Sequence, residues 1–259
     1  MKQQVYLYNT DREKLAGTLH LPETPSEKGV VMGHCFTCSR HTRILTRICN
    51  ALAQKGFMAL RFDFSGNGQS QGSFAESSYT KHIAEMKSAA NFMSEKGASQ
   101  IGFGGHSMGA AISVLAAAEI KNVKAVCVLA GRLSELIPAR YLNDFQKKEL
   151  RETGQASFDS RGRSLKLSEN FFSDAHQHDI PGIVTSLQIP LLVIHGDQDD
   201  IIPVEETRRA YNLNPSNIKL AIIPGADHMF SDEGHREKIA AMAAEWFAES
   251  LDNPNRASE

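Results

Sequence analysis

Seven short apolar segments recur along the chain, separated by longer segments in which apolar residues have helical spacing. The apolar segments are KLAGTLHLP (14–22), GVVMGHCF (29–36), FMALRFDF (57–64), QIGFGGH (100–106), VKAVCVLAG (123–131), IPLLVIHGD (189–197) and IKLAIIPGADH (218–228). Most of them show little alternation of period two, which is typical of strands covered on both faces. The pattern therefore predicts a mainly parallel β-sheet.

Five segments with helical spacing accompany these strands, near residues 42–55, 79–96, 107–120, 204–212 and 234–250. The last is the clearest, because one apolar stripe is formed by Ile239, Met242, Ala243, Trp246 and Phe247. Alternation of strands and helices implies right-handed βαβ crossovers. The fold class predicted is α/β, with a doubly wound and mostly parallel sheet.

The alternation stops between residues 132 and 189, where charged and polar residues predominate and no buried strand is evident. This segment is too long for an ordinary loop. We expect a helical insertion that caps the carboxyl edge of the sheet, where open α/β sheets bind ligands; the alternative is two peripheral helices that contact no ligand. The expected organisation is a core of residues 1–131 and 190–252, a cap of residues 132–189 and a flexible tail of residues 253–259.

Composition narrows the range of partners. The chain has 259 residues and a net charge of -2, which gives no electrostatic reason to expect nucleic acid or an anionic membrane as a partner. No window approaches the roughly 18 apolar residues that span a bilayer, and the N-terminal MKQQVYLYNT lacks the apolar stretch of a signal peptide. We expect a soluble, cytoplasmic protein with a small-molecule partner; the oligomeric state is not indicated.

The chain has four cysteines: Cys35, Cys38, Cys49 and Cys127. They are too few and too unevenly spaced for a disulfide framework, in agreement with a reducing compartment. Cys35 and Cys38, flanked by histidines in HCFTCSRH, could suggest a zinc or redox site. A structural zinc usually has two such pairs, whereas Cys49 and Cys127 fall in a predicted helix and a predicted strand. The favoured interpretation is two ordinary thiols.

Ser107 lies where the strand 100–106 meets a predicted helix. The surrounding GGHSMGAA has the G-x-S-x-G form of a nucleophile elbow. Gly105 and Gly109 remove Cβ atoms that would collide in so tight a turn. The helix N-terminus behind the serine offers N–H groups to a developing oxyanion. This context predicts a nucleophilic serine; the alternative is a glycine-rich turn with a passive serine.

A nucleophilic serine needs a base, and the base needs an acid that orients it. His228 fits the base best, because it follows the strand 218–228 in a short loop from which the imidazole can reach the elbow. The weaker alternatives are His34, His106, His176, His178, His195 and His235.

Candidates for the acid stand in HGDQDDIIP, directly after a predicted strand: Asp197, Asp199 and Asp200. Three carboxylates so close together cannot all be buried without raised pKa values, so at least one should be solvated. Asp63 in RFDFSGNGQS precedes the serine, and its turn-rich surroundings suggest that it hydrogen-bonds loop amides instead. The residues themselves do not decide which of Asp197, Asp199 and Asp200 is the acid.

The motifs together resemble the α/β-hydrolase superfamily, in the group that contains serine-aminopeptidase-like proteins and monoacylglycerol lipases. The resemblance covers nearly the whole chain, through GHCFTCSR, RFDFSGNGQSQG, GGHSMGAA, HGDQDDIIP and GADHMFSD. RFDFSGNGQSQG and GADHMFSD are most similar to bacterial cinnamoyl and feruloyl esterases. HCFTCSR and SLKLSENFFSDAHQHD are more similar to the hydrolase half of bacterial fusions that carry a peroxide-resistance domain; no such second domain is expected here.

This resemblance implies roles for five residues. Ser107 would be the nucleophile, Asp199 the acid and His228 the base, and the backbone N–H groups of Phe36 and Met108 would form the oxyanion hole.

The chain departs from the family pattern at Cys35. The usual His-Gly-x becomes His34-Cys35-Phe36, so a residue with a Cβ replaces a glycine that permits unusual backbone angles. Because Phe36 must aim its N–H at the oxyanion, we expect the side chain of Cys35 to lie close to the acyl site.

The expected function is that of a serine carboxylesterase for small esters, aryl or cinnamoyl esters among them, with no metal or organic cofactor. Within the insertion, apolar substrate contacts are expected from Phe145, Phe171 and Phe172. A thioesterase or a peptidase or amidase would use the same three residues. The alternatives from other classes are a non-catalytic binding protein of this fold and the Cys/His metal or redox site.

Overall fold

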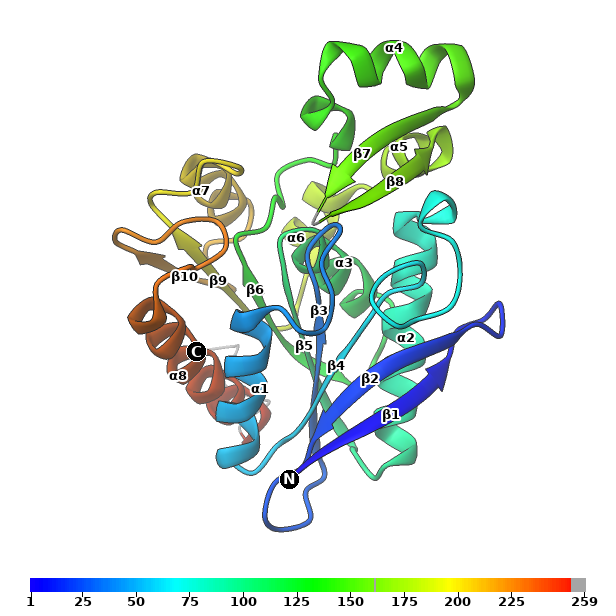
Figure 1. Ribbon diagram of the computed structural model, residues 1–259. Coiled ribbons are helices and arrows are strands. Elements are labelled where there is room, and N and C mark those ends of the chain that lie inside the picture. The colour runs from blue at the N-terminus through cyan, green and yellow to red at the C-terminus, as the bar shows by residue number, and fades with distance from the viewer. Residues whose placement is uncertain (161, 253–259) are drawn as a thin grey trace.

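An eight-stranded sheet forms the centre of the computed structural model, which describes residues 1–160 and 162–252 (Figure 1). The strand order is β1-β2-β4-β3-β5-β6-β9-β10. The bounds are β1 (Lys2–Tyr8), β2 (Lys14–His20), β3 (Lys28–Gly33), β4 (Met58–Phe62), β5 (Gln100–His106), β6 (Val123–Leu129), β9 (Leu191–Gly196) and β10 (Ile218–Ile223). Strand β2 is antiparallel to β1 and to β4, and the other neighbours are parallel. The predicted α/β fold class with a mostly parallel sheet is confirmed.

All seven predicted strands are present, and β1 is an additional one. In β1 the side chains of Val5 and Leu7 are buried, whereas those of Tyr6 and Tyr8 are exposed. This alternation is typical of an edge strand with one face on the core.

Helices cover both faces of the sheet: α1 (Arg43–Gln54), α2 (Tyr79–Glu95), α3 (Met108–Ala117), α7 (Val204–Leu213) and α8 (Glu233–Asp252), with a short 3-10 helix η1 (Phe74–Glu76) before α2. Helices α1 and α8 pack on one face and α2 and α3 on the other (Figure 1). The predicted stripe of α8 points inward, since Ile239, Ala243 and Phe247 are fully buried. Coverage of both faces explains why the central strands lack alternation.

The segment between β6 and β9 leaves the sheet. It contains η2 (Pro138–Tyr141), α4 (Asp144–Thr153), β7 (Gln155–Ser160), β8 (Arg163–Ser168), α5 (Glu169–Ala175) and α6 (Ile180–Ser186). Its part from α4 to α5 lies above the upper edge of the sheet in Figure 1, whereas α6 packs beside α3 and α7. The expectation of helices alone was wrong, because β7 and β8 pair as an antiparallel hairpin. Their sequences, QASFDS and RSLKLS, are too polar to indicate a buried strand.

A pair of hydrogen bonds ties this insertion to α2. The carboxylate of Asp174 in α5 accepts from the backbone N–H of Thr80 in α2 at 2.9 Å and from its hydroxyl at 2.6 Å. The insertion is therefore anchored on the side of α2.

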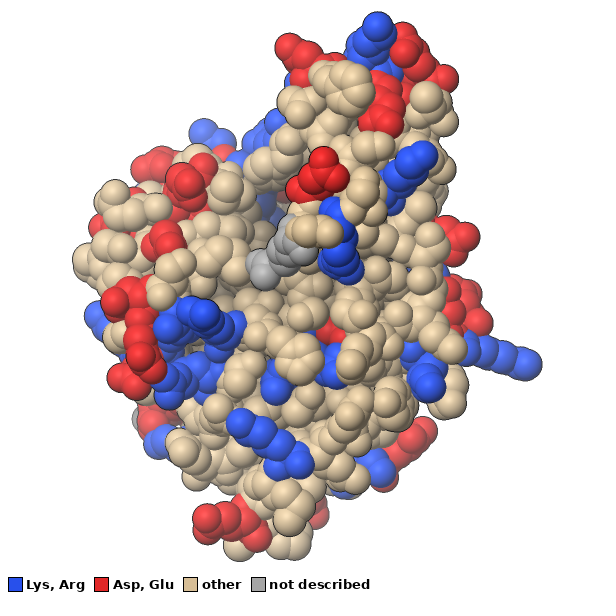
Figure 2. All heavy atoms as spheres, in the orientation of Figure 1, with Lys and Arg blue, Asp and Glu red and all other residues tan. Residues whose placement is uncertain are grey.

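Acidic and basic side chains are interspersed over the face shown in Figure 2, and both kinds occur on α4 at the top. Within residues 1–160 and 162–252, no helix combines the length and the apolar character needed to cross a membrane. The predicted tail of residues 253–259 lies outside the described residues.

Candidate active site

Ser107 occupies a tight turn between β5 and α3. Its backbone angles, φ 55° and ψ -113°, are unfavourable for a residue with a side chain, which is typical of a strained functional turn. A Cβ atom at Gly105 would overlap the carbonyl of Gly109, and one at Gly109 would overlap the carbonyl of Gly33. Gly105 therefore allows the turn to close, as the sequence suggested, and Gly109 allows the start of α3 to approach the end of β3.

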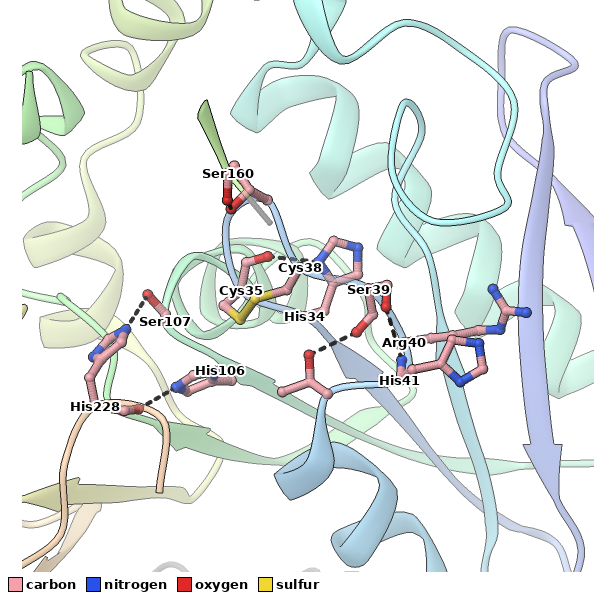
Figure 3. Close-up of a disulfide and its surroundings, with 12 residues drawn as sticks. His34, Cys35, Cys38, Ser39, Arg40, His41, His106, Ser107, Ser160 and His228 are labelled. Atoms are coloured by element: carbon pink, nitrogen blue, oxygen red, sulfur yellow. Dashed lines mark hydrogen bonds between the residues drawn. A yellow bond between two sulfur atoms is a disulfide. The ribbon is translucent and has the colours of Figure 1, made fainter. Parts of the chain in front are cut away.

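His228 lies in the loop between β10 and α8, beside Ser107 (Figure 3). Its Nε2 is 3.1 Å from the hydroxyl oxygen of Ser107, and its Nδ1 is 2.8 Å from Oδ2 of Asp199. Three residues from distant parts of the sequence thus form one chain of hydrogen bonds, in the order that a nucleophile, a base and an acid require.

Asp199 follows β9, and its carboxylate is fully buried. Its Oδ1 accepts from the backbone N–H groups of Ile201 and Ile202, at 2.9 and 2.7 Å, while Oδ2 accepts from His228 and from His195. Burial alone would raise the pKa of Asp199, but the hydrogen bonds from His195 and His228 outweigh it and hold the pKa well below its usual range. The carboxylate is therefore ionised and able to orient an imidazole.

The other two candidate acids face the solvent. Asp197 and Asp200 are exposed, and Oδ1 of Asp197 accepts from the backbone N–H of Gly225 at 2.7 Å. Asp63 is the remaining aspartate that was considered as the acid. It accepts from the backbone N–H groups of Arg40 and Gln69, at 2.6 and 2.9 Å, as its turn-rich surroundings suggested.

A second histidine, His195 at the end of β9, lies behind Asp199. Its Nε2 is 3.0 Å from Oδ2 of Asp199 and 2.8 Å from the carbonyl oxygen of Ile202. Because a carbonyl can only accept, Nε2 carries the proton, and Nδ1 accepts from the hydroxyl of Thr207 at 2.5 Å. The sequence showed His195 only as a weak alternative for the base; its place in the same HGDQDD segment as Asp199 was the available signal.

His106 holds the backbone of the loop that carries His228. Its Nε2 donates to the carbonyl oxygen of His228 at 2.8 Å (Figure 3). Burial, together with the nearby charge of His228, lowers the pKa of His106 to about 3, so the ring is neutral. His106 therefore supports the loop and is not placed to act as the base.

The loop that follows β3 contains a disulfide between Cys35 and Cys38 (Figure 3). The interpretation of these residues as two ordinary thiols was wrong, because they form a disulfide with each other. Spacing alone could not distinguish the two, because C-x-x-C fits thiols, metal ligands and a disulfide equally. The bond leaves neither sulfur as a thiolate ligand for zinc, so the metal interpretation has no support at this motif.

Backbone N–H groups near Ser107 are available to bind an anion. Met108 is the first residue of α3, where helical N–H groups have no intrahelical partner. Among the described residues, the backbone N–H of Phe36 has no hydrogen-bond acceptor. Phe36 and Met108 both line a cavity together with Ser107.

This cavity has a volume of about 410 Å³ and lies between the core and the insertion. It is mostly apolar, and its lining from the insertion includes Phe158, Leu167, Phe171 and Phe172. The ring of Phe36 packs against that of Phe171, with centroids 5.7 Å apart. Such a volume and lining suit a small apolar ligand.

Two of the residues expected in the pocket do not line this cavity. Phe145 is 73% exposed on α4, so its expected contact with substrate was wrong. Cys35 is only 3% exposed, because its side chain is turned into the disulfide. Phe171 and Phe172, on α5, do line the cavity. Which face of a short polar helix meets a ligand depends on packing, and the sequence contained no signal for it.

The charged residues among those lining the cavity are Arg132 and Glu135. Arg132 forms ion pairs with Glu135 at 3.1 Å and with Glu206 at 2.8 Å, and Glu135 also pairs with Arg140 at 2.6 Å. These charges neutralise one another, so the cavity offers no single unpaired charge to a ligand.

A family model described as "Serine aminopeptidase, S33" matches residues 27–180, which include the disulfide loop and the elbow. The chain belongs to this family of α/β-hydrolases. The S33 match ends before Asp199 and His228, so the geometry of the site comes from the structure.

Comparison with solved structures extends the likeness of this S33 protein over nearly its whole length. Est1E from Butyrivibrio proteoclasticus, with ferulic acid bound, is 26% identical, with a TM-score of 0.83 over 96% of this chain and 99% of that one. The esterase domain of a Rhodothermus marinus protein is 24% identical, with a TM-score of 0.75 over 97% and 99%. The α/β-hydrolase fold is thereby shown.

Curated relatives include two Mycobacterium tuberculosis proteins whose names describe them as candidate phosphoribosyl transferases. Each is 25% identical over 245 residues, which cover 93% of this chain. The chain spans 45% of the length of these relatives.

Proposed function

We propose that this protein is a serine carboxylesterase. Ser107 attacks the ester carbonyl, His228 accepts the hydroxyl proton and returns it to the leaving alcohol, and Asp199 stabilises the imidazolium. The N–H groups of Phe36 and Met108 bind the oxyanion, and water then hydrolyses the acyl-enzyme. The observation that carries this proposal is the unbroken hydrogen-bond chain from Asp199 through His228 to Ser107, which opens into an apolar cavity.

The acyl group proposed for this site is small and aromatic, of the cinnamoyl type. Aromatic rings of Phe36 and Phe171 line the cavity, and its charged residues are paired with one another. The ferulic acid bound to Est1E supports the same class of acid. We propose residues 132–189 as a cap that supplies part of this pocket, over a core of residues 1–131 and 190–252.

Two other activities fit the cavity less well. An aminopeptidase must bind a free α-amino group. The carboxylate that lines the cavity, Glu135, is already paired with Arg132 and Arg140. A phosphoribosyl transferase must bind phosphate groups. The guanidinium that lines the cavity, that of Arg132, is already paired with two carboxylates. That name also belongs to proteins more than twice as long as this chain.

The proposal is tested with a fluorophosphonate probe and a set of matched substrates. The probe should label the peptide that contains Ser107, as shown by mass spectrometry after digestion. A cinnamoyl ester should be hydrolysed faster than the thioester, and both faster than the anilide of the same acid. Labelling of another residue, or faster turnover of the anilide, would contradict a carboxylesterase.

We expect the loss of His195 to change the pH dependence of the reaction. His195 donates to the same carboxylate oxygen that His228 contacts, so His195→Leu leaves more negative charge on that oxygen. The imidazolium of His228 is then stabilised, so the acid limb of the kcat/KM profile moves to higher pH, by about one unit for a hydrogen bond of ~1.4 kcal/mol.

The matched control is His195→Gln, whose side-chain amide retains an N–H donor. This variant should keep the acid limb near the wild-type position, while both variants are checked for folding by Tm. Equal acid limbs in wild type and His195→Leu would show that His195 only fills space.

A further inference from the structure

The disulfide loop contains an unfavourable backbone conformation. The backbone N–H of Cys38 donates to the carbonyl oxygen of Cys35 at 3.0 Å, and their Cα atoms are 5.2 Å apart, which defines a tight turn. Thr37, the third residue of this turn, has φ 56°. A β-branched residue rarely adopts this left-handed conformation, for which glycine is the usual choice. The turn therefore needs external constraints to persist.

The described contacts provide three such constraints. The disulfide joins the first and last residues of the turn. The hydroxyls of Thr37 and Ser160 are 2.9 Å apart, and Arg163 donates to the carbonyl oxygen of Thr37 at 3.2 Å. Only the disulfide is covalent and lies within the turn itself.

The direction of the Phe36 N–H depends on this turn. That N–H and the carbonyl of Cys35 belong to one peptide group, and in a planar trans peptide they point in opposite directions. The carbonyl is held by the N–H of Cys38 and by Nδ1–H of His34 at 2.8 Å (Figure 3). Fixing the carbonyl therefore fixes the N–H on the opposite side.

His34 is in the protonation state that this arrangement requires. Its Nε2 accepts from the backbone N–H of Phe64 at 3.1 Å, so in the neutral ring the proton is on Nδ1. Burial lowers the pKa of His34 to about 4, so the ring is neutral near pH 7. The carbonyl of the peptide between Cys35 and Phe36 is thus held by donors from His34 and Cys38, which flank it in the chain.

We propose that the Cys35–Cys38 disulfide is a positioning element of the oxyanion hole. It maintains the turn at Thr37 and so aims the N–H of Phe36 at the oxyanion, at the position where the family pattern has a glycine in place of Cys35. This inference rests on the proposed esterase function. If Cys35 and Cys38 were two ordinary thiols, replacing either one would leave the activity unchanged. With the disulfide in this role, replacing either cysteine lowers the activity.

Reduction of the disulfide has the same consequence. A dithiol such as dithiothreitol supplies two electrons and two hydrogens: its sulfurs close into a cyclic disulfide while Cys35 and Cys38 become thiols. The turn then loses its covalent closure, and the N–H of Phe36 loses its fixed direction. Because the two half-cystines are 3% and 4% exposed, reduction is slow under native conditions.

The test compares wild type with Cys35→Ser and Cys38→Ser. We expect kcat for a cinnamoyl ester to fall at least tenfold, toward the ~10²–10³-fold that loss of one oxyanion donor costs, with little change in KM. The affinity for an arylboronic acid, whose serine adduct resembles the oxyanion, should fall in parallel. Dithiothreitol should lower wild-type kcat and leave the Cys38→Ser variant unchanged.

The substitution Thr37→Gly tests whether activity lost with the disulfide returns when the turn no longer needs it. Glycine adopts a positive φ without strain, so Thr37→Gly added to Cys38→Ser should restore most of kcat and of the boronate affinity. A double variant that regains Tm but not kcat would assign the disulfide a structural role only, and so overturn the proposal.

The proposed function is tested separately, by hydrolysis in wild type and its loss in Ser107→Ala. If those results hold while both cysteine variants keep wild-type kcat and boronate affinity, only the positioning role of the disulfide fails.

Discussion

Ser107→Ala is expected to reduce the kcat for a cinnamoyl or short-chain aryl ester by a factor of about 10³ to 10⁶. The substitution removes the nucleophilic oxygen, which lies 3.1 Å from Nε2 of His228. The residual rate comes from binding and the oxyanion hole, which the variant retains. Alanine has the same steric limits as serine at φ 55°, so Tm should change little.

The measurement is initial-rate kinetics, with thermal unfolding of the same preparations. Ser94→Ala is a matched control, because Ser94 is exposed on α2 and its loss should leave kcat unchanged. A Ser107→Ala variant with wild-type turnover would exclude a nucleophilic role for Ser107.

Asp199→Asn is expected to lower kcat by a factor of about 10⁴. Oδ2 of Asp199 holds Nδ1–H of His228 at 2.8 Å, and this contact leaves Nε2 free to accept the proton of Ser107. An amide nitrogen at that position favours the opposite tautomer of the imidazole, in which Nε2 carries a proton and cannot act as a base.

Two neighbouring aspartates serve as internal controls. Asp197→Asn and Asp200→Asn remove the same charge from exposed positions, so their kcat should stay within a few-fold of wild type. All three variants are compared by kcat/KM and by Tm. If Asp200→Asn impaired turnover as much as Asp199→Asn, the acid would have been assigned to the wrong carboxylate.

The parts of the fold that are local in sequence could be predicted from the chain. Central strands such as β5 and β9 are continuous apolar runs because helices cover both faces of the sheet. The turn at Ser107 was also evident, since close backbone approach at Gly105 and Gly109 requires residues without a Cβ. Steric and hydrophobic limits of this kind restrict which residue types can stand at a position, and so they leave a direct pattern in the sequence.

Contacts between distant segments were decided only by the tertiary structure. The residues themselves left three aspartates open, and the fold buries Asp199 between His195 and His228 while Asp197 and Asp200 face the solvent. Thr207 gave no signal of its own, because its hydroxyl matters only beside the ring of His195.

The lining of the cavity by the insertion and the pairing of the cysteines also depend on the tertiary structure. Nothing in the composition of α4 and α5 shows that Phe145 faces outward while Phe171 lines the cavity, because both helices are short and mostly polar. The spacing of Cys35 and Cys38 fits thiols, ligands and a disulfide, and only the turn at Thr37 brings the two residues together. The sequence by itself determined seven strands of the sheet, the five helices that cover it and the elbow at Ser107. The acid, the pocket walls and the disulfide were decided by tertiary structure, because burial, side-chain direction and sulfur pairing depend on neighbours that the chain order does not specify.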